Sequence, residues 1–161
     1  MNEEGYKIKK IIRIIAIILI ILLIIIAFYI YIKQNNDKKV KKNLIKLGYK
    51  EITSNTFNKK NKETSYNYNI KTKDFSKTIN TKTQTESKNI VINTKGKSIA
   101  IYYTYMNVNL CKLSQKGTYE NNDFKCTIRK KTNSCNVKCD EMYKEIKIFE
   151  KEYNELYKDV K

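Results

Sequence analysis

An uninterrupted apolar run from Ile14 to Ile32 most constrains what this chain can fold into. A helix rises about 1.5 Å per residue, so the run makes a rod of about 28 Å, close to the thickness of the hydrocarbon core of a bilayer. A helix at the surface of a soluble domain keeps a polar face, and this run has none. No charged residue lies between Arg13 and Lys33, so the run carries no sign of an ion path. The sequence therefore predicts one transmembrane helix, assigned to residues 11–32.

This helix is expected to remain as an uncleaved signal anchor. The run exceeds the roughly 7–15 apolar residues of a secretory signal, and it closes on Phe28, Tyr29 and Tyr31, which suit a membrane interface. The preceding tail, residues 1–10, is short and basic, and such a tail resists translocation. Lysines are at least as dense after the run, so a count of positive charges does not decide the orientation. We expect a cytoplasmic N-terminus and an extracytoplasmic C-terminal part.

Residues 33–48 are predicted to form a juxtamembrane helix that continues the anchor. Val40, Leu44 and Leu47 repeat at helical spacing, and Gly48 follows as a natural end of the helix. The remaining residues, 49–161, are sufficient for one domain with its own core.

Within this domain the pattern of apolar residues predicts an antiparallel sheet of about four to six strands. Strands are expected at 56–60 and 64–73, then a polar mobile loop near 74–88. A hairpin around Gly96 joins residues 89–93 to residues 98–110, and the second arm is apolar on both faces over 99–105, as a strand covered on two sides would be. Another strand is expected over 124–129, after a turn at 121–123.

The chain is predicted to end in an amphipathic helix. Its apolar positions recur at spacings of three and four: Met142, Ile146, Phe149, Tyr153, Leu156 and Val160. Such a stripe is suited to packing on a sheet. The fold class is therefore a single N-terminal transmembrane helix plus a small α+β domain made of a short helix, an antiparallel sheet and a C-terminal amphipathic helix.

Four cysteines, Cys111, Cys126, Cys135 and Cys139, all lie in the last third of the chain. An even number in a domain that faces an oxidising compartment predicts two disulfides. The alternative is a zinc site of four thiolates in a domain that faces the cytoplasm and uses its basic surface for nucleic-acid or regulatory contacts. Only Cys135 and Cys139 have a spacing near that of zinc-binding pairs, and the chain contains no histidine.

Sequence alone does not choose among the three possible pairings of these cysteines. As a working prediction we pair Cys111 with Cys126 and Cys135 with Cys139. The second bridge needs a distorted first helical turn, since residues i and i+4 project along one face of a regular helix. If that turn is regular, Cys111 or Cys126 must instead reach forward and staple the helix to the sheet.

Charge is concentrated between the anchor and the last helix. The chain has a net charge of +17, the first 36 residues +3 and residues 139–161 −2, which leaves +16 for residues 37–138. Besides the lipid bilayer, the expected partners are anionic headgroups or envelope polymers. Nucleic acid is not expected, because lysines on the solvent face and tyrosines within the sheet explain the pattern without it. No protein partner is indicated.

Catalysis finds no support in the residue pattern. Without histidine the Ser-His and Cys-His dyads are absent, and so is the most common general base. Asp140 and Glu141 begin a predicted helix, where acidic side chains stabilise the helix dipole. No cofactor or metal is expected. The sequence predicts a single-pass membrane protein, not an enzyme, with a structural or binding role in a cell envelope.

Overall fold

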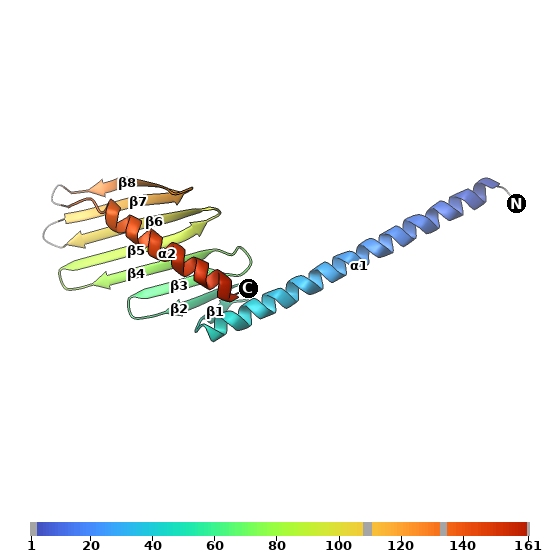
Figure 1. The fold of residues 1–161 in the computed structure, drawn as a ribbon, viewed down its shortest axis with the longest axis horizontal. Coiled ribbons are helices and arrows are strands. Elements are labelled where there is room, and N and C mark those ends of the chain that lie inside the picture. Colours follow the sequence, from blue (N-terminus) through green and yellow to red (C-terminus); the bar gives the residue numbers. More distant parts are fainter. Residues whose placement is uncertain (1–2, 108–110, 133–134, 161) are drawn as a thin grey trace. The chain divides into compact units, whose positions relative to one another are not determined.

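The structure, a computed structural model, describes residues 3–107, 111–132 and 135–160. The chain divides into two compact units, residues 1–39 and 40–161. Helix α1 (Glu3–Lys46) is followed by eight strands and by helix α2 (Cys139–Val160), as Figure 1 shows. The strands are β1 (Lys50–Thr53), β2 (Thr56–Lys60), β3 (Thr64–Asn69), β4 (Phe75–Lys82), β5 (Glu86–Lys95), β6 (Ser98–Asn107), β7 (Cys111–Glu120) and β8 (Asp123–Lys131).

The first unit consists of the greater part of α1. The helix is long and apolar enough from Lys9 onward to cross a membrane, and none of its apolar stretch is buried. Every Ile and Leu from Ile11 to Ile32 is exposed to solvent, on all sides of the helix. Such a helix is stable in lipid, where its backbone groups are paired and its side chains meet hydrocarbon. An N-terminal apolar helix therefore fits a single-pass membrane anchor. The limits 1–10, 11–32 and 33–48 within it stay predictions.

In the second unit, α1 ends where the sequence predicts. Gly48 has a φ of 84°, and its N–H donates to the carbonyl of Ile45, while the N–H of Tyr49 donates to the carbonyl of Leu44. This pair of hydrogen bonds is a Schellman motif, which needs a left-handed residue at the position of Gly48. Leu44 is fully buried and Tyr49 is buried beside it in the same core cluster. The end of α1 is thus a part of the domain.

The eight strands form one antiparallel sheet in sequence order, β1 to β8, which is more than the four to six expected. Three strands went unrecognised in the sequence: β1, β4 and β7. The expectation of a loop near 74–88 is wrong, because β4 and the first residues of β5 occupy most of this segment. The two strands pair with each other over seven positions. Residues 108–110, the end of the predicted second arm of the hairpin, lie outside the described residues.

Several predicted elements are confirmed. Strand β2 has the predicted limits, β5 and β6 form the hairpin around Gly96, and β8 covers the predicted strand. Asn121 and Asn122 have φ values of 51° and 65°, as the tight turn between β7 and β8 requires. Helix α2 contains all the predicted apolar positions, and five of these six residues are buried.

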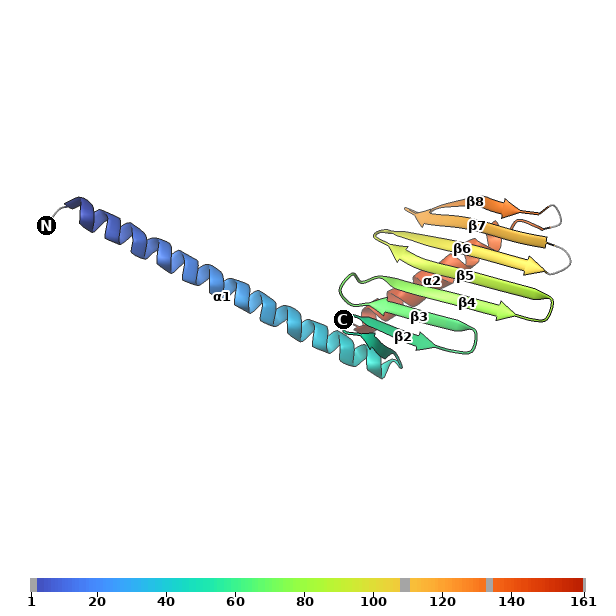
Figure 2. The ribbon, with the colours of Figure 1, turned by 180° about the vertical axis from the view of Figure 1, so that it is seen from behind.

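One face of the sheet, here called the helix face, carries α2, and the other is called the open face. Figures 1 and 2 view the sheet from its two sides, with α2 on one side only. In β6, Ile99, Ile101 and Tyr103 are buried on the helix face. On the open face only the small Ala100 is buried, whereas Tyr102 is half-buried and Thr104 is exposed. Our expectation of a strand covered on both sides is therefore wrong. Along the described part of the domain, helices cover a single face.

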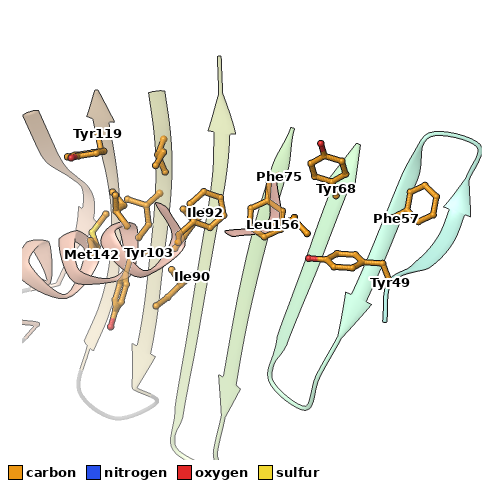
Figure 3. Packing of buried hydrophobic residues seen from close by; sticks show 14 of the residues in the cluster. Tyr49, Phe57, Tyr68, Phe75, Ile90, Ile92, Tyr103, Tyr119, Met142 and Leu156 are labelled. Carbon is orange, nitrogen blue, oxygen red and sulfur yellow. The ribbon is translucent and has the colours of Figure 1, made fainter. Parts of the chain in front are cut away.

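The core fills the space between the sheet and α2 (Figure 3). Phe75 of β4 is central, because its ring stacks on Phe149 at 5.1 Å between centroids and on Tyr66 and Tyr153 at 5.9 Å. Such aromatic pairs add about 0.5–1.5 kcal/mol each beyond the burial of their area. These contacts join strands β3 and β4 to the middle and the C-terminal half of α2.

Candidate functional site

The end of the domain at which α2 begins contains all four cysteines, in two pairs at disulfide distance. Cys111, the first residue of β7, is bonded to Cys135, with 5.3 Å between their Cα atoms. Cys126 of β8 is bonded to Cys139, the first residue of α2, with 5.8 Å between Cα atoms. Both bridges therefore fix the start of α2, and the segment before it, to the last two strands.

The predicted pairing of Cys111 with Cys126 and of Cys135 with Cys139 is wrong, and the strand register explains why. Cys126 lies opposite Gly117, which is six residues along β7 from Cys111. Six residues of a strand span about 20 Å, far beyond the reach of a disulfide. Since α2 is regular from Cys139, two sheet cysteines reach forward, as expected for a regular first turn.

Gln115 completes this junction from inside the sheet. Its side chain is buried, with an exposed fraction of 1%. Its Oε1 accepts a hydrogen bond of 2.8 Å from the backbone N–H of Lys138, which precedes α2. Its Nε2 lies 3.5 Å from the sulfur atoms of Cys126 and Cys139. A buried amide in the middle of β7 thus binds an N–H at the helix start that has no partner within the helix.

Beside the disulfides lies a cleft of about 510 Å³, bounded by strands β4 to β7 and the start of α2. Its walls are polar and aromatic, and include Glu86, Lys88, Tyr103, Tyr105, Lys138 and Glu141. We call this the cysteine-end cleft. The bridge between Cys111 and Cys135 forms part of its lining, so the covalent link also shapes the cleft.

Two carboxylates on the walls of the cysteine-end cleft are each held by hydrogen-bond donors. Glu86 Oε1 accepts hydrogen bonds from the Tyr105 hydroxyl at 2.8 Å and from the Asn107 amide at 3.1 Å. Glu141 pairs with Lys88 at 3.3 Å and accepts from the Tyr103 hydroxyl at 3.3 Å.

The surroundings of the two tyrosines raise the pKa of both. Burial, and then the charge of Glu141, raise the pKa of Tyr103 well above its ordinary value. The hydrogen bond to Glu86 raises the pKa of Tyr105. Both hydroxyls are protonated at neutral pH, as an ordinary tyrosine hydroxyl is, and they donate to the two carboxylates. With two lysines and two carboxylates on its walls, the cleft can form hydrogen bonds to a polar ligand at balanced charge.

Sequence reasoning identified the cysteines but missed the cleft. Glu141 was assigned to the dipole of α2, and its contacts with Lys88 and Tyr103 depend on strands that are 53 and 38 residues away. Gln115 gave no signal, since a glutamine within a weak apolar pattern indicates an exposed segment. In the described ranges, no three His, Cys, Asp or Glu side chains come together as a metal site would require.

Comparison of the chain with protein-family models, with curated proteins and with solved structures gave no match.

Proposed function

We propose that this chain is a single-pass membrane protein of the cell envelope, with a cytoplasmic N-terminus and an extracytoplasmic domain over residues 49–161. Its role is structural or ligand-binding and not catalytic. An apolar helix with no buried surface supports the anchor. The short basic tail before it supports the orientation, because such a tail resists translocation.

One observation carries the proposal: both cysteine pairs cross-link the start of α2 to the sheet. Disulfides persist in oxidising compartments and are rare in the cytosol. In the chain-entropy model, closing loops of 24 and 13 residues stabilises the domain by about 3.5 and 3 kcal/mol. A domain whose total stability is of the order of 5–15 kcal/mol depends on such a contribution.

The binding part of the proposal is supported by the cysteine-end cleft, which offers fixed donors and acceptors at the end of the domain that the disulfides hold. The alternative, a cytoplasm-facing domain with a zinc site, would need four free thiolates that converge on one point. The observed pairing uses all four sulfur atoms in two covalent bonds instead.

Thiol status in the native compartment tests the proposal. Cells that produce the full chain are quenched in acid, free thiols are blocked by alkylation, and the unreduced protein is digested and mapped. We expect linked peptides that join Cys111 to Cys135 and Cys126 to Cys139. Four alkylated thiols would contradict the extracytoplasmic location and would favour the zinc-binding alternative.

A further inference from the structure

Four lysines on the last two strands form a line on the open face of the sheet. On β7, Leu113 and Gln115 are buried on the helix face, so Lys112 and Lys116 project from the open face by strand alternation. On β8, Cys126 reaches α2 from the helix face, which places Lys125 on the open face. Lys130 is the fourth member. We call Lys112, Lys130, Lys116 and Lys125 the cationic row.

The strand register spaces these charges evenly. Lys130 lies opposite Ser114, and Lys125 lies opposite Thr118. The lysines therefore alternate between β7 and β8 at steps of two residues, in the order Lys112, Lys130, Lys116, Lys125. Two residues of an antiparallel strand rise about 7 Å, so four charges follow one another along about 20 Å of the sheet edge.

A bulge in β8 brings Lys130 into this row. The register shifts between Ser114 and Gln115, whose partners are Lys130 and Ile128, which leaves Arg129 as the extra residue. Without the shift, Lys130 would follow Ile128 by two residues and would project from the helix face. Bulges re-aim side chains in this way. The irregularity thus supplies the second charge of the row.

The row is cationic because its lysines lack acidic partners in the described residues, with one exception. Lys125 lies 3.5 Å from Asp123, and the two side chains are 76% and 64% exposed. An ion pair so exposed contributes little free energy. The ammonium of Lys116 lies over the ring of Tyr102, 5.9 Å from its centroid. On the helix face, by contrast, Lys77 and Lys88 are paired with carboxylates of α2.

We propose that the cationic row binds a linear phosphodiester polymer of the cell envelope, with phosphates that repeat about every 7 Å. Lysine binds phosphate as a point charge, and an even line of such charges suits an extended chain. Lipid headgroups present a plane of charge, which a single line along one edge of the sheet matches poorly. The choice of an envelope polymer rests on the extracytoplasmic location of the proposed function. Figure 2 views the sheet from this face, with β7 and β8 at one edge.

Binding of fluorescent synthetic poly(glycerol phosphate) to the full chain in zwitterionic detergent micelles tests the proposal. The row variant replaces Lys112, Lys116, Lys125 and Lys130 by Gln. A matched control replaces four exposed lysines outside the row by Gln: Lys62, Lys71, Lys97 and Lys144. Both variants lose the same net charge. At 50 mM salt we expect the row variant to bind at least tenfold more weakly than the wild type, and the control within threefold of it.

The salt dependence gives a second readout. Four phosphate contacts, at a slope of about −0.7 each, weaken wild-type binding about 50-fold between 50 and 200 mM salt, and most of this dependence should vanish in the row variant. Equal losses in the two variants would mean that net charge, not the row, binds the polymer, and would overturn the proposal.

Two further probes distinguish the source of the phosphate. A single-stranded DNA oligomer of equal phosphate number that binds tenfold more tightly would identify a nucleic-acid site instead. Row-dependent binding to vesicles with 30% anionic lipid, without binding to the polymer, would identify headgroups. Either result refutes the envelope polymer. All these measurements use purified protein, so their failure leaves the thiol mapping, and with it the proposed function, unaffected.

Discussion

The ion pair between Lys77 and Glu152 offers the sharpest test of how the sheet and α2 are held together. Lys77 lies on β4 with its side chain directed into the core, and its exposed fraction is 5%. Its ammonium lies 2.9 and 3.0 Å from the two carboxylate oxygens of Glu152, to which the Tyr66 hydroxyl also donates. A buried ammonium is stable only with such a partner.

Replacing Glu152 by Gln removes the negative charge and leaves the Lys77 ammonium buried. Breaking a buried pair costs about 3–5 kcal/mol, and Glu152 keeps a side-chain exposure of 30%, so water can reach the site. We therefore expect a loss of about 3 kcal/mol, or a fall in the Tm of the domain of about 10 °C. Removing both charges with Lys77→Met and Glu152→Gln should cost less than about 1 kcal/mol, since no buried charge then remains.

The measurement is denaturant unfolding of the full chain in micelles, with disulfides intact, followed by the near-ultraviolet circular dichroism of tyrosine. Glu155→Gln on the same helix is the control, because Glu155 and Lys151 lie 4.0 Å apart with exposures of 62% and 79%. That variant should change the free energy of unfolding by less than about 0.5 kcal/mol. The reasoning is refuted if Glu152→Gln behaves like Glu155→Gln, or if the double variant is as unstable as the single one.

Three further predictions test other parts of the account. Ile21→Lys combined with Leu22→Lys places two charges near the bilayer centre, and each costs about 2.5–3.5 kcal/mol of insertion free energy. The protein should therefore leave the carbonate-resistant membrane fraction or be degraded. Full retention would show that another feature holds the protein in the membrane. Gly117→Ala places a Cβ 2.6 Å from Phe124 Cε2 and 2.8 Å from Ile101 Cγ2, so it should cost about 1–3 kcal/mol in denaturant unfolding; wild-type stability would contradict the close packing of β7 and β8. Burial raises the pKa of Tyr66 and Tyr68 to about 12, so the folded state holds these protons more tightly than the unfolded chain does. Their contribution to the free energy of unfolding is complete below about pH 10 and is lost as the pH rises through about 12. Phenolate absorbance should therefore show a group of tyrosines that ionises together with unfolding, whereas ionisation of all tyrosines near about pH 10 in folded protein would contradict this prediction.

Elements whose signals are local could be predicted from the sequence. The stripe of α2, the glycine that ends α1 and the turn at Asn121 and Asn122 each depend on residues within a few positions of one another. Their physical causes, helical periodicity and left-handed backbone, are visible without knowledge of the fold.

Strands β4 and β7 could not be predicted, because polar residues occupy their core positions. In β4 the alternating inward positions are Phe75, Lys77 and Ile79. The lysine is tolerated there only because it pairs with Glu152 of α2, which lies 75 residues further along the chain. In β7, Gln115 is buried where an apolar residue is expected, and its partner is the N–H of Lys138, 23 residues on. These long-range pairs hide the strand pattern.

The prediction of the cysteine pairing was wrong for a related reason. Proximity in sequence favoured Cys111 with Cys126, but the tight turn between β7 and β8 sets a register that separates them by about 20 Å. Only the position of α2 over the sheet brings Cys135 and Cys139 to their partners. The cysteine-end cleft, formed by the same junction, was equally inaccessible to sequence reasoning.

Labelling of a single added thiol tests whether the disulfide-linked domain lies outside the membrane. Gln84 lies exposed in the turn between β4 and β5, and Gln84→Cys leaves the four native cysteines in place. Intact cells that produce this variant are treated with a membrane-impermeant maleimide, and the number of labels per chain is measured by mass spectrometry before and after permeabilisation in denaturant, which exposes buried sulfur atoms such as that of Cys135. The account predicts one label per chain in intact cells and no more after permeabilisation, because the native cysteines are bonded. No label in intact cells, followed by five after permeabilisation, would place the domain in the cytoplasm with free thiols and would contradict the account.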